Sequence, residues 1–382
     1  MHHSLGLNEY QALAARTDKT RAKGNGFDLP VLGLVGEVGS LLSELKKKQR
    51  DSAAYVSYEN TVLEELGDAL WYLAIIADHA TIKLAVIASE MTTDGTEVYF
   101  AALQPQHALP LNSPTVRFEK TLLKLAGATG ALSSFIVEGD PPDPSLLRVE
   151  LTRTFKLLVE AANEAAVTLE AAARQNLAKA EDRWPSERVF PTLFDADFDP
   201  HEQLPRKLEI EIYERDAGGG KSFVLQRCNG IFIGDRLTDN IMRPDDYRFH
   251  DVFHYAYAAI LGWSPVIRAL FKVKRKSQAQ VDEGQDGARA GLIEEGVATY
   301  VFGIAKEFDF FHNEKPGDLS FTFLKNVRQF VRGYEVDHAP LWLWEEAILQ
   351  GNHAFRFLRE NRRGLVKLDI EGRSLTIEEL PK

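Results

Sequence analysis

The chain has 382 residues, of which 45% are hydrophobic and 26% are charged. That composition is typical of a globular protein with a sizeable core, and the length favours two domains. The net charge of −11 argues against a basic nucleic-acid-binding surface. A single cysteine, Cys228, excludes an intrachain disulfide and fits a reducing, cytoplasmic compartment. Neither a signal-peptide pattern nor an apolar run of membrane-spanning length is present, so we expect no membrane association.

Apolar residues in the first half recur with the spacing of amphipathic helices. Helices are predicted over residues 8–23, 31–48, 58–90, 117–137 and 145–182. The segment 91–115 contains a glycine and several prolines and is predicted to be an inserted loop. We therefore expect an all-α bundle over residues 1–190.

The two helical blocks of this half align with each other. Residues 34–41 match residues 125–132 at an offset of 91, and residues 77–84 match residues 162–169 at an offset of 85. The difference in offset falls in a loop, where insertions are tolerated. A true duplication and a shared helix composition both explain the match. A duplication predicts a pseudo-dimeric four-helix core within one chain. The protein could then be a monomer, although a homo-oligomer is also compatible with the sequence.

Carboxylates line one stripe of the second and third predicted helices. Glu65 and Asp68 are three residues apart and share a helix face, Glu64 lies beside Asp68, and Glu37 lies on the preceding helix. Carboxylates that face a core repel one another and lose hydration, and a cation between them relieves both costs. Oxygen ligands suit Mg²⁺ or Mn²⁺, so the pattern predicts a metal site of the kind used in phosphate chemistry. The alternative is a solvated acidic helix face.

At these residues the chain resembles the MazG family of all-α nucleoside triphosphate pyrophosphohydrolases. The matching segments are residues 33–39, 46–48, 64–73, 176–179 and 183–185. The resemblance covers roughly residues 1–190 apart from the inserted loop. It implies a magnesium-dependent reaction in which a nucleoside triphosphate and water give the monophosphate and diphosphate.

The family's acidic signature maps onto Glu37, Glu65 and Asp68, and the resemblance implies that these residues are catalytic and bind the metal. The chain departs from the family at Ser40, where the signature has a further acid. A hydroxyl is a weaker magnesium ligand than a carboxylate, which puts one metal subsite in question. Glu44 or Glu64 could instead hold a second ion or a water molecule.

The resemblance also implies polar and cationic residues that bind the substrate's phosphates: Asn176, Lys179, Arg183 and Lys47. Cations at a helix end also offset the helix dipole without any ligand, which is the alternative for Lys179 and Arg183. If Ser40 cripples turnover, the protein is a nucleotide-binding sensor that signals through its second half.

The second half mixes alternating and helical patterns. Strands are predicted over residues 208–213, 222–226, 365–370 and 374–377, and helices over residues 247–261, 289–308, 319–334 and 341–359. We therefore predict an α+β domain over residues 205–382. It resembles the domain that often follows MazG modules.

A second candidate metal site lies in this α+β half. His250 and His254 are four residues apart on a predicted helix, a spacing that lets two imidazoles share one ion. Glu294 or Glu295 could complete a two-histidine, one-carboxylate site for a transition metal, and the main chemistry would then lie here. The alternative is a pair of core histidines bonded to neighbouring acids.

Overall fold

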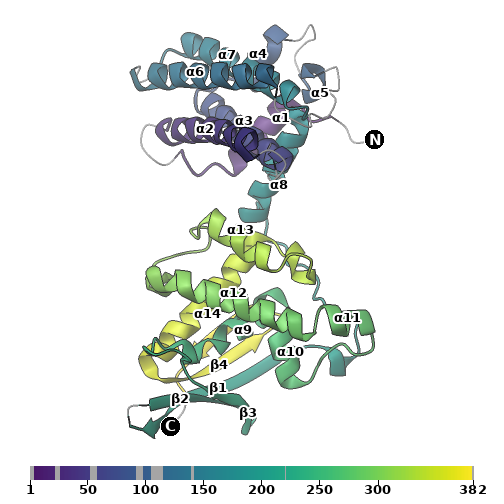
Figure 1. Cartoon of the computed structure of the whole chain (residues 1–382), viewed down its shortest axis with the longest axis vertical. Helices are drawn as coiled ribbons and strands as arrows, with labels where there is room; N and C mark the ends of the chain where they lie inside the picture. The colour runs from purple at the N-terminus through teal and green to yellow at the C-terminus, as the bar shows by residue number, and fades with distance from the viewer. Residues whose placement is uncertain are drawn as a thin grey trace. The chain divides into compact units, whose positions relative to one another are not determined.

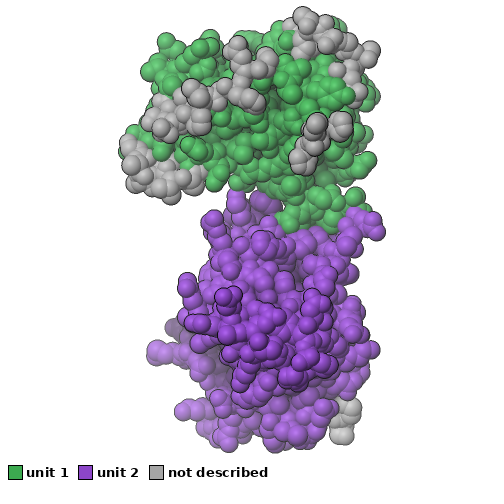
Figure 2. All heavy atoms as spheres, turned by 90° about the vertical axis from the view of Figure 1, so that its right-hand side faces the viewer, with its two compact units in different colours: residues 1–186 green, residues 187–382 purple. Residues whose placement is uncertain are grey.

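The computed structural model describes residues 4–21, 26–51, 58–91, 98–104, 115–138, 142–219 and 221–380. Most of the predicted insertion at 91–115 lies outside these residues. The chain divides into two compact units, residues 1–186 and 187–382 (Figure 2), and each has its own hydrophobic core. The first unit is helical, and the second combines helices with one sheet, as the sequence predicted. None of the described helices has the length and apolar character of a membrane span.

Two antiparallel helix pairs build the first unit. Its helices are α1 (Leu7–Arg16), α2 (Asp28–Asp51), α3 (Tyr58–His79), α4 (Leu84–Ala88), α5 (Phe100–Leu103), α6 (Val116–Glu138), α7 (Pro144–Glu164) and α8 (Leu169–Arg183), shown in Figure 1. Helix α2 packs against α3, α6 packs against α7, and the two pairs meet through α2 and α6. Leucines at helical spacing, such as Leu66, Leu70 and Leu73 of α3, are fully buried in this core.

The two longest predicted helices are each broken in two, so the predicted continuity over 58–90 and 145–182 is wrong. The chain turns between α3 and α4 at Thr81, with φ 59°, and between α7 and α8 at Ala166, with φ 56°. Neither residue is a glycine or asparagine, the usual signals for a left-handed helix end. The helical spacing continues through both turns, which is why it did not reveal them.

These two turns have the same backbone geometry. The amide of Ile82 donates to the carbonyl of Ala77 at 2.8 Å, and the amide of Val167 donates to the carbonyl of Ala162 at 3.1 Å. The second donor lies 85 residues after the first donor, and the second acceptor lies 85 residues after the first acceptor. This is the offset between the matching sequences. This bond is donated by the residue after the positive-φ position, the third residue past each helix, and it closes a Schellman-type end in both places. Shared helix composition does not account for a repeated turn, so the geometry favours duplication.

The second unit is built on a five-stranded antiparallel sheet of order β3-β2-β1-β4-β5. The strands are β1 (Lys207–Gly218), β2 (Lys221–Cys228), β3 (Ile231–Leu237), β4 (Arg363–Asp369) and β5 (Ser374–Glu378). The four predicted strands are confirmed, whereas β3 was not predicted. On the central strand, Ile210 and Ile212 alternate with more exposed residues and face the core.

Helices cover one face of this sheet (Figure 1). They are α9 (Asp251–Ala256), α10 (Pro265–Phe271), α11 (Ala279–Gly284), α12 (Ala288–Glu307), α13 (Phe321–Phe330) and α14 (Leu341–Asn361). Helices α9 and α14 contact the strands β4 and β5, while α12 packs against α9, α10 and α13. Helix α9 continues directly into a π-helical turn, η5 (Tyr257–Leu261), a distortion that occurs often at functional sites.

Candidate functional site

Three carboxylates converge between α2 and α3 of the first unit. Glu37 comes from α2, Glu65 and Asp68 come from α3, and one oxygen from each lies within 4.8 Å of the others. The two α3 residues share a face because they are three positions apart, and α2 packs directly against that face. We call Glu37, Glu65 and Asp68 the acid trio. The structure thus brings together the three acids that the sequence placed on facing stripes.

The acid trio is half-buried, and its charges are poorly compensated. Burial is the largest cause that raises the pKa of Glu65, and the neighbouring Glu37 and Asp68 add to it, bringing the pKa to about 8. Burial likewise raises the pKa of Glu37. Glu65 therefore holds a proton at neutral pH when no cation is bound. Three half-buried carboxylates that converge in this way are a donor set that fits Mg²⁺.

Gly67 allows α8 to approach this face of α3. A Cβ atom at residue 67 would lie 2.5 Å from the carbonyl oxygen of Ala172 and 3.2 Å from Cβ of Asn176. Both distances are shorter than ordinary nonbonded contacts, so any side chain at Gly67 would push α8 away. The close crossing places the α8 residues Asn176 and Lys179 next to the acid trio.

Asn176 and Lys179 both contact Asp68. The side-chain amide of Asn176 donates to Oδ1 of Asp68 at 2.7 Å, and Lys179 Nζ contacts Oδ2 of Asp68 and Oε1 of Glu64, the latter at 3.2 Å. Burial alone would lower the pKa of Lys179, but the charges of Asp68 and Glu64 outweigh it and raise the pKa. Asn176 therefore orients Asp68, and Lys179 supplies the positive charge beside it.

The remaining predicted residues of this site are not among the three converging carboxylates and have partners of their own. Glu44 is buried and forms an ion pair with Lys47 at 2.6 Å, so the metal role predicted for Glu44 and the substrate role predicted for Lys47 find no support in this geometry. Glu64 faces Lys179 and is not one of the three converging carboxylates. Arg183 is only 1% exposed, and its guanidinium lies 5.2 Å from the ring centre of Trp184, so its geometry gives no support to the predicted substrate role.

The second copy of the helix pair carries a different surface at the equivalent positions. With the offsets of 91 and 85, Ala128 corresponds to Glu37 and Arg153 corresponds to Asp68. Arg153 lines an open groove of about 650 Å³ between α6 and α7 together with Lys124 and Lys156. Among the described residues, this copy forms no carboxylate group that could hold a metal. The acidic site therefore belongs to the first copy alone.

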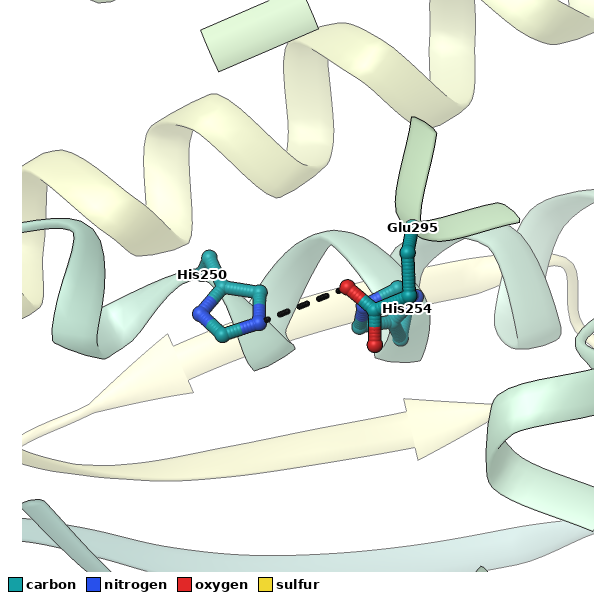
Figure 3. A group of neighbouring side chains, drawn as sticks. All are labelled: His250, His254 and Glu295. Carbon is teal, nitrogen blue, oxygen red and sulfur yellow. Dashed lines mark ion pairs between the residues drawn. The ribbon is translucent and has the colours of Figure 1, made fainter. Parts of the chain in front are cut away.

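In the second unit, His250, His254 and Glu295 converge (Figure 3). One ligand atom from each lies within 4.8 Å of the others. His254 is fully buried and His250 is 8% exposed. Burial opposes protonation of His254, but Glu294 and Glu295 raise its pKa to about 10, while burial lowers the pKa of His250. Glu294, the other predicted ligand, contacts His254 Nδ1 at 2.8 Å and is not one of the three converging groups.

Residues 189–381, about half of the chain, match the family model described as the MazG C-terminal domain. The chain belongs to the MazG C-terminal domain family. The matched residues include His250, His254 and Glu295, whereas the acid trio lies outside the match. Membership in this family points to a nucleotide-related function.

A phage protein matches a much shorter stretch of this MazG C-terminal domain protein than the family model does. The chain is 34% identical over 64 residues to Gene 37 protein of Mycobacterium phage L5. That stretch covers 16% of this chain and 56% of the phage protein, so just over half of the relative is spanned. No solved structure matches the chain.

Two features of the site were not recognised in the sequence. Asn176 was assigned to the substrate, but its amide orients Asp68. Gly67 lies inside the matching segment 64–73, and a glycine inside an apolar helix signals close approach of another backbone. That signal could have predicted the crossing of α8 over α3.

Proposed function

We propose that the first unit is a magnesium-dependent nucleoside triphosphate pyrophosphohydrolase, which converts a nucleoside triphosphate and water into the monophosphate and diphosphate. The observation that carries the proposal is the convergence of Glu37, Glu65 and Asp68 next to Lys179. The resemblance of the surrounding segments to MazG pyrophosphohydrolases and the nucleotide-related family of the second half support it.

The acid trio would hold Mg²⁺, which supplies positive charge at the α-phosphate and at the departing diphosphate. Burial raises the pKa of both Glu37 and Glu65 in the metal-free chain, so both carboxyls hold a proton more readily than an exposed carboxyl does. A carboxylate of this pair can therefore accept the proton of the attacking water as its oxygen bonds to the α-phosphorus and the bond to the β-phosphate oxygen breaks.

The α8 residues have separate roles in this proposal. The side-chain amide of Asn176 donates to Oδ1 of Asp68, and this bond fixes the direction of the other carboxylate oxygen of Asp68. Lys179 is a half-buried cation at the edge of the acid trio and can extend from Glu64 to a phosphate oxygen of the substrate. A single site then forms from both copies of the duplicated bundle.

The test is a panel of nucleoside triphosphates with Mg²⁺ or Mn²⁺ and the full-length chain, with products resolved by ³¹P NMR. We expect monophosphate and diphosphate, and a loss of about 10²-fold or more in kcat for Glu65→Gln. Glu59→Gln, an exposed change on the same helix, is the matched control and should leave kcat unchanged. Release of the nucleoside diphosphate and orthophosphate would refute the assigned bond cleavage.

Ser40 favours a second candidate function, a nucleotide-binding sensor with weak turnover. The hydroxyl stands one helical turn after Glu37 and adds no charge to the acid trio. Tight nucleotide binding without any diphosphate release would favour the sensor over the hydrolase.

A further inference from the structure

The histidine cluster of the second unit is built from two facing elements. His250 directly precedes α9, His254 lies one turn later on α9, and Glu295 extends from α12. Figure 3 shows the carboxylate of Glu295 directed toward the imidazoles. Oε2 of Glu295 lies 3.7 Å from Nε2 of His250 and 3.4 Å from Nε2 of His254.

The ring of His250 has a defined orientation and tautomer. Its Nδ1 atom lies 2.8 Å from the carbonyl oxygen of Tyr247, and because a carbonyl can only accept, Nδ1 carries the proton. The Tyr247 ring stacks on the imidazole with a centroid distance of 4.2 Å and an angle of 3°. In the neutral imidazole the Nε2 lone pair therefore faces Glu295, and Asp251 Oδ1 lies 3.3 Å from the same nitrogen.

His254 is oriented by Glu294. Oε1 of Glu294 accepts from His254 Nδ1 at 2.8 Å and from Ser264 Oγ at 2.6 Å, and Oε2 accepts from the amide of Val266 at 2.8 Å. Both oxygens are thus committed to donors inside the protein, so Glu294 cannot also turn toward a metal. A carboxylate behind a ligating imidazole is the usual arrangement at metal sites, where it fixes the ring and raises its basicity.

The opposite nitrogen of His254 is a buried polar atom without a hydrogen-bond partner. Nε2 is inaccessible to solvent, and at 3.4 Å its geometry to Glu295 does not satisfy a hydrogen bond. If both imidazoles were neutral, two lone pairs would face the carboxylate and repel it, so the cluster requires a positive charge at this point. Either added protons or one divalent cation supplies that charge.

The distances from the two imidazoles to the carboxylate are close to those around a bound ion. A tetrahedral ion with ligands at about 2.0–2.1 Å keeps its ligand atoms about 3.3–3.4 Å apart. The two Nε2 atoms stand 3.4 and 3.7 Å from the carboxylate oxygen. Imidazole ligands favour zinc and other first-row transition metals over Mg²⁺. The Glu295 side chain is 42% exposed, so solvent reaches the site from that side.

We propose that the α+β unit binds one divalent transition-metal ion through His250 Nε2, His254 Nε2 and the Glu295 carboxylate, with Glu294 as a positioning residue behind His254. The site is independent of the acid trio and differs from it in donor atoms. Three protein ligands on a solvent-accessible side leave a coordination position for water, as in zinc sites that exchange ligands.

The test uses the full-length chain with Glu65→Gln, which weakens metal binding by the acid trio. After chelator treatment the protein is titrated with Co²⁺, with visible absorption and metal analysis of the dialysed complex as readouts. We expect one Co²⁺ per chain with the spectrum of a nitrogen-containing site. If the chain binds no more Co²⁺ than a control protein that has no metal site, the proposal is overturned and the cluster is a network of ion pairs.

Variants separate the ligands from their support. Glu295→Gln and His250→Ala should each weaken Co²⁺ binding by about tenfold or more, whereas His353→Ala, which removes an exposed imidazole, should not. Glu294→Gln should weaken binding but retain the absorption spectrum, because it changes no ligand. His254→Ala removes a fully buried ring and is informative only if circular dichroism shows a folded chain. Unchanged binding in Glu295→Gln, with the fold intact, overturns the proposal.

Discussion

The charge of Glu65 should set the pH dependence of stability in the first unit. In the folded, metal-free chain its pKa is about 8, raised from 4.5 by burial and by the other acids. A raised carboxyl pKa contributes stability that is fully present below the unfolded pKa near 4.5 and is lost as the pH rises through 8. The change Glu65→Gln removes this titration. The wild-type chain should therefore lose stability across this pH window relative to the variant.

The expected size follows from the shift and the exposure. Each unit of pKa change corresponds to about 1.4 kcal/mol. Because Glu65 is only half-buried, solvent screens much of this energy, and we expect a net difference of about 1–2 kcal/mol. For a unit of this size that is a change of about 2–8 °C in the midpoint of thermal unfolding. Mg²⁺ should restore the loss in the wild type, by about 2.7 kcal/mol at a hundredfold excess over its dissociation constant.

The assay is differential scanning calorimetry between pH 5 and 9 in the presence of a chelator, repeated with Mg²⁺. Glu65→Gln should show a flatter dependence of the first unit's transition on pH and a smaller response to Mg²⁺. Glu59→Gln, the exposed control on α3, should follow the wild type. Parallel pH profiles for the wild type and Glu65→Gln would refute the reasoning, because they would mean that the acid trio is not strained by its own charge.

Three further outcomes follow from the same site. Gly67→Ala should destabilise the first unit by about 1–3 kcal/mol in urea unfolding, since the new Cβ meets Ala172, whereas Gly130→Ala, which meets no atom within 4 Å, should be neutral or stabilising. Lys179→Met should lower kcat/KM for the triphosphate by about tenfold or more, because a charge-assisted phosphate contact is lost, while Lys120→Met on the exposed side of α6 should have no effect. Ser40→Glu should raise kcat if an acid at that position completes a metal subsite; equal or lower turnover in a folded variant would argue against this.

Local sequence patterns were sufficient for much of the first unit but not for its turns. Apolar spacing located α2, α3, α6 and α7 because each buries one continuous stripe. The ends at Thr81 and Ala166 depend on tertiary packing that holds two ordinary residues at positive φ. In the second unit, β3 was missed because it contains Gly234 at positive φ and leaves most of its residues exposed, so it lacks the alternation of a half-buried strand.

For the candidate sites too, local patterns predicted which residues share a helix face but not all of their partners. Helical spacing brought Glu65 and Asp68 to one face, and it brought His250 and His254 together. Spacing along one helix does not reveal which partner a side chain meets across the core. Glu294 turned to Ser264 and Val266, which lie outside its own helix, whereas Glu44 paired with Lys47 at i,i+3 spacing on α2.

The central claim is that one divalent cation is shared by the acid trio. The most direct measurement is Mn²⁺ binding by electron paramagnetic resonance in the full-length chain with Glu295→Gln, which weakens the proposed second site. We predict that Glu37→Gln, Glu65→Gln and Asp68→Asn each lower Mn²⁺ affinity by about tenfold or more, since each removes a carboxylate ligand. Mn²⁺ affinity that is the same in all three variants and in the parent would contradict the account.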